Sequence, residues 1–199
     1  MIRSLRLEKK YWKHMMLPGI KKQREKNRKP DALMISGREY DAVFFHLPEK
    51  PNGYLSNWYV SPFDLDSIRF SSVEQYIMYR KCLLFGDEAS ARAVLSTDDT
   101  ASQQMIGRKA SGYIEHVWDG NRQMVLLRRL LAKFGQNVDL KENLLSTGNA
   151  YIVECAGSNR IWACGLRLNI DERHVASAWT GSNILGFALM EILSILRDS

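Results

Sequence analysis

The sequence predicts a mainly helical α+β protein: one compact domain with a small β-sheet, preceded by a basic N-terminal extension. Three segments, at residues 41–46, 63–70 and 150–155, have the apolar or alternating pattern of short strands. Longer segments with helical periodicity lie between and after them. A chain of 199 residues is long enough for one well-buried core, so we place the domain at residues 39–199 and the extension at residues 1–38.

The positive charge of the chain is concentrated at its N-terminal end. Residues 1–40 hold 12 Lys and Arg against 4 Asp and Glu, whereas the remaining residues hold 16 against 18. A basic segment of this kind can neutralise phosphates, which makes nucleic acid a candidate partner. The alternatives are a solvated tail, disordered or partly helical, and a stretch translated ahead of a later start such as Met34.

The composition argues against several classes of protein. No run approaches the roughly 20 apolar residues of a membrane-spanning helix, so we expect no membrane partner. The basic N-terminus is not followed by the apolar part of a signal peptide, and the three cysteines share no CxxC spacing. These features favour a cytoplasmic protein with reduced thiols. The four histidines form no HExxH or similar pair, so we expect no metal site.

Residues 54–59, YLSNWY, follow a predicted loop and place Ser56 and Asn57 beside aromatic side chains, including Trp58. Serine and asparagine side chains donate and accept hydrogen bonds, and aromatic rings offer flat stacking surfaces. The segment therefore suits a nucleobase or a ribose. A hairpin edge with a local asparagine turn explains the same pattern. Residues 63–70 then predict a hairpin that leads into the next helix.

The stretch at residues 71–85 predicts a central helix. Two overlapping capping boxes mark its start, Ser71-x-x-Glu74 and Ser72-x-x-Gln75. At about 100° per residue, Glu74 and Lys81 lie within about 40° of Met78 and Phe85, on the apolar face. Removing water from an unpaired charge is costly or shifts its pKa, so an acid and a base on this face are candidates for chemistry. The alternative is that Glu74 only caps the helix and Lys81 extends to solvent.

Later segments predict further helices at residues 87–95, 100–108, 116–134 and 139–145. Thr100-x-x-Gln103 matches another capping box, and Gly135 is expected to end the long helix. The predicted core stripe of that helix consists of Met124, Leu127, Leu131 and Phe134.

The C-terminal part combines a glycine-containing loop with a last helix. The loop at residues 157–166 carries Arg160 and Trp162, which suit a phosphate and a base. The turn Gly181-x-Asn183 precedes an apolar helix at residues 184–196, which Asn183 or the serine before it can cap. Such a helix N-terminus can hold a phosphate, although turns of this kind are common.

Several short motifs occur in order along the chain: Ser56-Asn57-Trp58, Val73-Glu74-Gln75-Tyr76 with Lys81, Gly107-Arg108, Trp118, Ala132-Lys133-Phe134, Leu144-Leu145-x-Thr147-Gly148, Val153-Glu154, Arg160-Ile161-Trp162 and Gly181-x-Asn183-x-Leu185-Gly186-x-Ala188-Leu189-Met190-Glu191. Each motif alone is weak, but the ordered set resembles the NADAR family, the YbiA-like N-glycosidases. The resemblance runs from about Phe44 to the C-terminus and leaves residues 1–38 outside.

The resemblance implies a compact, mainly helical α+β domain that cleaves a bond between ribose C1 and a nitrogen, with no metal or redox cofactor. Members of the family act on phosphoribosylamino-pyrimidine intermediates of riboflavin synthesis, or remove ADP-ribose from guanine bases in nucleic acid. By position, it implies that Glu74 and Lys81 are catalytic. It also implies that the substrate contacts Ser56, Asn57, Trp58, Gly107, Arg108, Trp118, Glu154, Asn159, Arg160, Trp162, Gly181 and Asn183.

One motif departs from the family pattern. Many relatives have Asp-Arg-x-Trp-Gly where this chain has Asn159-Arg160-Ile161-Trp162-Ala163. An amide at residue 159 carries no negative charge and cannot act as a base, so catalysis is slower or altered if the family's aspartate does either. Ala163 also adds a methyl group where the backbone can approach a ligand.

Cleaving an N-glycosidic bond needs a carboxylate near C1 and a donor for the leaving nitrogen. Glu74 suits the first role. The role of Lys81 stays open: it could keep Glu74 ionised, bind phosphate, or attack an opened ribose and form a Schiff base. Arg108 and Arg160 suit a diphosphate, and the tryptophans either stack on a base or pack in the core.

We therefore carry three functional hypotheses. The first is a hydrolase that removes ADP-ribose from guanine in nucleic acid or nucleotide. The second is a glycosidase of phosphoribosylated pyrimidines. The third, kept open by Asn159, is a module that binds ADP-ribose or nucleic acid without catalysis.

Overall fold

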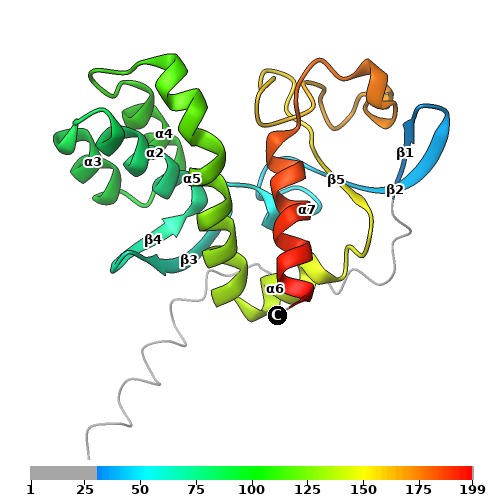
Figure 1. The fold of residues 1–199 in the computed structure, drawn as a ribbon, viewed down its shortest axis with the longest axis horizontal. Helices are drawn as coiled ribbons and strands as arrows, with labels where there is room; N and C mark the ends of the chain where they lie inside the picture. Colours follow the sequence, from blue (N-terminus) through cyan, green and yellow to red (C-terminus); the bar gives the residue numbers. More distant parts are fainter. Residues whose placement is uncertain (1–30, 199) are drawn as a thin grey trace, which may run out of the picture.

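The computed structural model describes residues 31–198 and shows the α+β class that the sequence predicts (Figure 1). The strands are β1 (Asp31–Ile35), β2 (Arg38–Phe45), β3 (Val60–Leu65), β4 (Ile68–Ser72) and β5 (Tyr151–Glu154). The α-helices are α2 (Val73–Leu84), α3 (Glu88–Leu95), α4 (Thr100–Arg108), α5 (Glu115–Gln136), α6 (Val138–Leu145) and α7 (Ile184–Arg197). Short 3-10 helices are η1 (Gly53–Leu55), η2 (Asp171–His174) and η3 (Ala176–Ala178).

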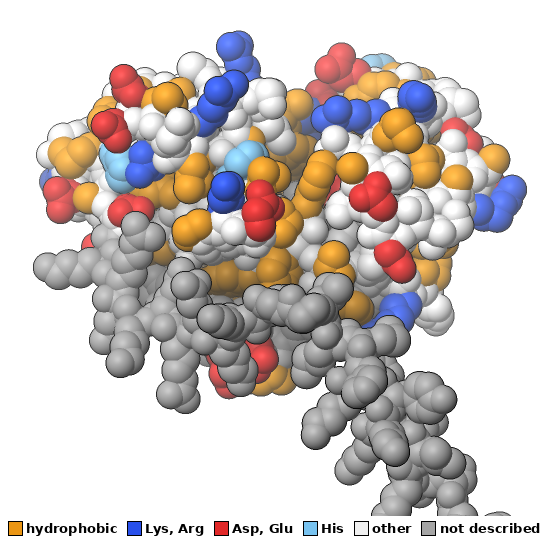
Figure 2. Space-filling view, turned by 180° about the vertical axis from the view of Figure 1, so that it is seen from behind, with side chains coloured by type: hydrophobic (Ala, Val, Ile, Leu, Met, Phe, Trp, Pro, Cys, Tyr) orange, Lys and Arg blue, Asp and Glu red, His pale blue; other side chains and the backbone are white. Residues whose placement is uncertain are grey.

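The elements form two lobes, with α5 and α7 between them (Figure 1). One lobe contains the β3–β4 hairpin and helices α2, α3 and α4. The other contains a sheet in the order β1-β2-β5, antiparallel between β1 and β2 and parallel between β2 and β5. Helix α5 packs against α2, β3 and α7, while α7 also packs on β5. Figure 2 shows Lys and Arg side chains on both sides of a notch at the upper edge, between the lobes.

Residues 31–38 belong to the packed domain. Strand β1 pairs with β2 through a turn in which Ser36 and Gly37 have φ angles of 49° and 79°, as a two-residue hairpin turn requires. Leu33 of β1 is fully buried. The expected boundary between residues 38 and 39 therefore falls within a hairpin, which the sequence hides because the first four residues of β2 are exposed and mostly polar. The rest of the predicted extension, residues 1–30, lies outside the described residues.

The central helix begins as the second capping box predicts. The hydroxyl of Ser72 accepts a hydrogen bond from the Gln75 N–H at 3.1 Å. The Gln75 side chain accepts from the N–H of Ser71 at 2.7 Å and donates to the carbonyls of Val94 and Thr97. The cap of α2 is thereby tied to the end of α3.

Two predicted helix ends are wrong. Asp99, not Thr100, caps α4, because its carboxylate accepts the Ser102 N–H at 2.8 Å. Helix α5 does not end at Gly135 but continues through Gln136. A single glycine is tolerated inside a long helix whose other residues are well packed.

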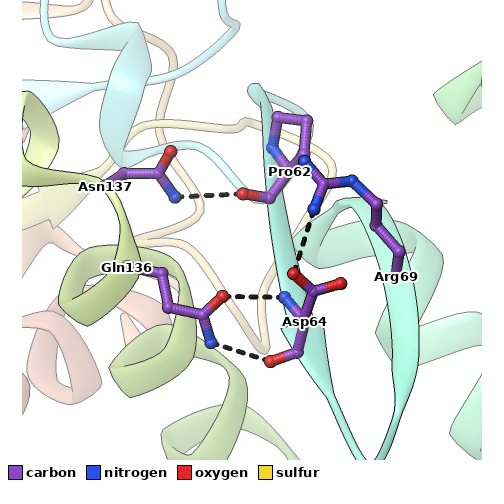
Figure 3. Close-up of polar contacts among 5 residues, drawn as sticks. All are labelled: Pro62, Asp64, Arg69, Gln136 and Asn137. Atoms are coloured by element: carbon purple, nitrogen blue, oxygen red, sulfur yellow. Dashed lines mark hydrogen bonds and ion pairs between the residues drawn. The ribbon is translucent and has the colours of Figure 1, made fainter. Parts of the chain in front are cut away.

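The end of α5 is held on strand β3 (Figure 3). The Gln136 side chain accepts from the Asp64 N–H at 2.8 Å and donates to the Asp64 carbonyl at 2.7 Å. Asn137 donates to the carbonyl of Pro62 at 3.2 Å, and Arg69 on β4 pairs with the Asp64 carboxylate at 2.9 Å. These contacts, rather than the glycine, decide where the helix ends.

Half of the predicted core stripe of α5 is wrong, because Phe134 is fully buried and Leu127 packs on the core partly buried, but the other two residues are exposed. Met124 is 74% exposed and Leu131 is 40% exposed. The fully buried inner face consists of Leu126, Arg129, Leu130, Lys133 and Phe134. Because two cations interrupt that face, a search for apolar side chains alone selects a neighbouring stripe.

Candidate active site

A cavity of about 580 Å³ opens between the two lobes. Its walls come from α2, the end of α4, the start of α5, the end of β5 and the loops around residues 46–58 and 156–162. It brings together most of the predicted site residues: Ser56, Asn57, Trp58, Glu74, Lys81, Arg108, Trp118, Glu154, Asn159, Arg160 and Trp162. The ordered motifs of the sequence therefore converge on one place.

Gly107, Gly181 and Asn183 do not line this cavity. A Cβ atom at Gly107 would collide with the side chain of Met78, so the glycine lets α4 pack closely on α2. A Cβ atom at Gly181 would collide with the carbonyl oxygen of Ala163. Both glycines shape the walls through packing, and the substrate contact expected of them is not supported.

Asn183 connects β5 to the start of α7. It is buried in the left-handed conformation (φ 48°), donates to the carbonyl of Ile152 at 2.9 Å and accepts from the N–H of Glu154 at 3.0 Å. Its side chain makes no capping bond to α7. The backbone N–H groups of residues 182–185 donate to the carbonyls of residues 160–163. The predicted phosphate site at this helix N-terminus is therefore wrong, because its donors are already engaged.

Glu74 lies on the cavity face of α2 and is only 5% exposed. Its Oε1 accepts a hydrogen bond from Gln104 at 3.2 Å. Burial raises the pKa of Glu74, while the Gln104 bond and the charges of Arg129, Arg108 and Lys81, in that order, oppose the rise. The strongest cationic neighbour of Glu74 is therefore a residue that the sequence analysis did not single out.

Lys81 is 8% exposed, and its Nζ lies 4.2 Å from the centroid of the Tyr113 ring. Burial lowers the pKa of Lys81; the charge of Arg108 also lowers it, whereas Cys82 and Glu74 raise it. Among residues 31–198, no ion pair within 4.0 Å joins Lys81 to Glu74. Arg129 and Arg108 oppose the rise in the pKa of Glu74 more strongly than Lys81 does.

Glu154 ends β5 at the cavity wall. Burial, together with the charges of Glu74 and Cys164, raises its pKa to about 8. Its Oε2 is buried without a hydrogen-bond partner among the described residues. When two carboxyl groups interact, the proton resides on the one that lacks cations. Of the two, Glu74 has cationic neighbours that oppose the rise of its pKa, whereas Glu154, with a pKa of about 8, carries a proton near neutral pH.

Arg129 of α5 lies behind the cavity rather than in its lining. Its guanidinium is completely buried, and its three nitrogens have no hydrogen-bond partner in the described part of the chain. Its Cζ lies 5.9 Å from the centroid of the Trp162 ring. Burial, opposed by the charge of Glu74, lowers the pKa of Arg129 to about 9, so the group is charged at neutral pH.

Lys133, one turn further along α5, holds the turn that carries the first site motif. Its Nζ donates to the carbonyls of Tyr54 at 2.6 Å and Ser56 at 3.1 Å. The carbonyl of Asn57 in turn accepts from the N–H of Glu74 at 2.9 Å. Burial, together with the charge of Arg129, lowers the pKa of Lys133 to about 7.

The departure at residue 159 preserves a structural role. Asn159 accepts hydrogen bonds from the N–H groups of Ile161 at 3.2 Å and Trp162 at 2.9 Å. An aspartate would accept the same bonds, so the amide keeps the turn and loses only the charge. Ala163 is fully buried and does not line the cavity, so the expected approach of its methyl group to a ligand is not supported.

The sequence analysis missed His46 and Gln104, which also line the cavity. Gln104 lies one helical turn before Arg108, a spacing that could have revealed it as a neighbour on the same face of α4. His46 follows β2; its Nδ1 is buried without a hydrogen-bond partner among the described residues, and burial lowers its pKa. No local pattern marks this histidine, because the loop across the cavity lies more than a hundred residues away in the chain.

The described residues contain no group of three or more His, Cys, Asp or Glu that could hold a metal ion. Between residues 31 and 198, no helix is both long enough and apolar enough to cross a bilayer. The three cysteines are free and buried.

Comparisons with known proteins identify a matching family and several relatives of the chain. Residues 43–197 match the family model of the NADAR domain. The chain is 33% identical over 158 residues to N-glycosidase R617 of Acanthamoeba polyphaga mimivirus, covering 75% of this chain and 93% of that protein. The NMR structure of the Escherichia coli protein YbiA matches with a TM-score of 0.66 and 25% identity, over 79% of this chain and 85% of that one. Riboflavin biosynthesis protein VVA0006 of Vibrio vulnificus is 27% identical over 156 residues, 78% of this chain and 39% of that protein.

A mixed domain with two buried carboxyl groups in one cavity, of which Glu74 has cationic neighbours and Glu154 has none that lower its pKa, has the groups that glycoside hydrolysis needs. The chain belongs to the NADAR family of YbiA-like N-glycosidases, which confirms the predicted family, the α+β fold and the enzyme class, a hydrolase of N-glycosyl bonds.

Proposed function

We propose that this N-glycosidase removes ADP-ribose from guanine bases of nucleic acid or nucleotide. The observation that carries the proposal is that Glu74, which has cationic neighbours, and Glu154, whose pKa is raised to about 8, line one cavity beside Arg108 and Arg160. Glycosidic cleavage uses a carboxylate and an acid, and two arginines suit the diphosphate of ADP-ribose.

In the proposed reaction, the bond between ribose C1 and the base nitrogen breaks, and its electron pair stays on the nitrogen, which takes a proton from Glu154. Positive charge develops on the ribose, and the carboxylate of Glu74 stabilises it. Glu74 then accepts a proton from the water whose oxygen bonds to C1. Return of a proton from Glu74 to Glu154 through solvent completes the cycle and leaves ADP-ribose and the free base.

The tryptophans in the cavity walls supply the surface for the base. Trp118 is almost fully buried, whereas Trp58 and Trp162 are partly exposed. A ring held by packing on one side and open on the other can stack on guanine. Arg129 behind Trp162 adds a cation to the buried side of that ring.

Two roles for Lys81 give opposite results in Lys81→Arg. If an ammonium binds phosphate, arginine keeps the charge and most of the activity. If a free amine attacks an opened ribose, arginine abolishes activity, because a guanidinium does not form a Schiff base. Turnover of Lys81→Arg and reductive trapping of the wild type distinguish the two.

An alternative substrate is a phosphoribosylamino-pyrimidine. The similarity to VVA0006, which is named a riboflavin biosynthesis protein, favours it. The same acid and carboxylate would cleave its glycosidic bond, but the substrate carries one phosphate where ADP-ribose carries two and an adenosine.

Incubation with guanine-ADP-ribosylated DNA, and separately with the phosphoribosylamino-pyrimidine, separates these functions. Turnover of the first substrate that falls about 100-fold or more in Glu74→Gln supports the proposal. The matched control is Glu142→Gln, an exposed glutamate on α6. Turnover of the pyrimidine alone assigns the alternative. Binding of ADP-ribose without product from either substrate identifies a non-catalytic module and contradicts the proposal.

The basic residues 1–30 form part of this proposal as a contact to nucleic acid. Deletion of residues 1–30 leaves β1 intact and is expected to flatten the dependence of DNA affinity on salt, because fewer phosphates are neutralised. An unchanged slope would exclude this contact.

A further inference from the structure

A second cavity, of about 400 Å³, lies beside the first. The two cavities share His46, Ala156 and Ser158, so they form neighbouring compartments along one wall. The second cavity continues past these residues to Lys50 and Arg167. Its volume lies in the range of about 300–1,000 Å³ that small-molecule sites occupy.

The lining of the second cavity is basic. Lys50 and Arg167 are both exposed cations, and its lining includes no Asp or Glu. Asn169 and Ser158 add groups that can donate and accept hydrogen bonds, and Leu168 adds an apolar surface. This combination suits a ligand with both a phosphate and an uncharged ring.

Gly157 positions one of the cations. A Cβ atom at Gly157 would lie 2.8 Å from Cγ and 3.3 Å from Nε of Arg167. The arginine stem therefore lies directly over the backbone at residue 157, and a larger residue there would displace it. The loop that carries Asn159 and Arg160 into the first cavity thus also supports the basic wall of the second.

His46 lies on the wall that the cavities share. Buried polar atoms almost always have a hydrogen-bond partner, but Nδ1 of His46 has none among the described residues. Its neighbours on the protein side are Glu49, whose charge raises its pKa, and Lys50, whose charge lowers it. An imidazole in this position is available to a ligand that spans both compartments.

We propose that the second cavity binds the nucleoside-phosphate part of the substrate, the half of ADP-ribose that lies beyond the reacting ribose. This inference rests on the proposed function, since the first cavity must hold the scissile bond. The second cavity then sets the substrate class. A phosphoribosyl substrate ends at its single phosphate and leaves the compartment empty, whereas an ADP-ribosyl substrate fills both.

The test compares both substrates in Lys50→Ala/Arg167→Ala. The ratio of kcat/KM for the ADP-ribosyl substrate to that for the phosphoribosyl substrate is expected to fall about tenfold or more, mainly through KM, because charge-assisted contacts to phosphate are lost. The matched control is Arg38→Ala/Arg92→Ala, which removes two exposed arginines outside both cavities. An equal fall in the control, or an unchanged ratio in the variant, would overturn the inference.

Filling the compartment gives an independent readout. Asn169→Trp is expected to weaken ADP-ribose and AMP binding by calorimetry about tenfold while ribose 5-phosphate binding is retained. If the wild type binds AMP and Asn169→Trp does not, but no ADP-ribosyl substrate is cleaved, the proposed function fails and the subsite stands. Equal AMP binding by both proteins refutes the subsite whatever the turnover.

Discussion

Helices α2 and α5 both bury charged side chains, but they present them differently. On α2, Glu74 and Lys81 are nearly buried yet line the cavity. On α5, Arg129 and Lys133 are fully buried and lie behind the cavity wall. The first pair can touch a substrate, whereas the second can act only through other groups: Arg129 through its charge on Glu74, and Lys133 through the turn at residues 54–58.

The difference shows where stability is given up for function. A buried guanidinium without hydrogen-bond partners is destabilising, and apolar replacement of such charges is often neutral or stabilising. A positive charge behind Glu74 nevertheless opposes the rise in the pKa of that buried carboxyl group. The predictions below separate charges that hold the fold from charges that hold the site, beginning with the largest expected effect.

Removing the cation behind Glu74 tests the comparison most severely. Arg129→Met is expected to lower kcat/KM about tenfold or more, since loss of a positive neighbour raises the pKa of Glu74 further and protonates it. The acidic limb of the pH–rate profile should shift to higher pH, while the free energy of unfolding is unchanged or increased.

Arg128→Met is the matched control for this variant. Arg128 is the preceding residue of α5, but it is exposed and pairs with Asp66. It should leave the pH–rate profile unchanged. Lower stability of Arg129→Met with an unshifted profile would show that Arg129 serves the fold rather than the site.

The buried Lys133 should make the free energy of unfolding depend on pH. Its pKa is lowered from 10.5 to about 7 in the folded protein, so between these values the unfolded chain binds the extra proton. The free energy of unfolding should therefore rise from pH 7 to pH 9 by up to about 1.4 kcal/mol per unit relative to Lys133→Met. Urea unfolding at a series of pH values measures this, with Lys141→Met as control. Parallel curves for wild type and Lys133→Met would contradict the assignment.

An exposed ion pair should matter least. Arg69 and Asp64 pair across the β3–β4 hairpin with most of both side chains in solvent. Arg69→Ala is expected to change the free energy of unfolding by about 0.5 kcal/mol or less and to leave turnover unaffected. A larger change in thermal unfolding would remove the contrast between buried and exposed charges.

The comparison of helices also explains what the sequence could reveal. The cavity face of α2 follows from periodicity and a strong cap, because its charges stand among apolar neighbours within one short helix. The inner face of α5 cannot be predicted in the same way, because a hydrophobic pattern assigns residues such as Arg129 and Lys133 to the surface. Their spacing with Leu126 and Leu130 was the available signal.

Tertiary contacts account for the remaining differences between the predicted and the observed structure. The turn before α7 has the composition of an anion site, but the carbonyls of residues 160–163 occupy its donors. Its Asn183 supports Glu154 instead, from 29 residues away. Strand β1 was not predicted from the sequence, because only Leu33 among its residues is fully buried. The contacts of the turn and of Asn183 depend on partners that are distant in the chain.

The central claim is that Glu74 acts as carboxylate and Glu154 as acid within one cavity. The most direct test is the pH dependence of kcat/KM for wild type and Glu154→Gln. Because the pKa of Glu154 is raised to about 8, wild-type activity should fall as pH rises through that value. Glu154→Gln, whose amide donates a hydrogen bond at every pH, should be slower but lack this basic limb. A basic limb that persists unchanged in Glu154→Gln would contradict the account.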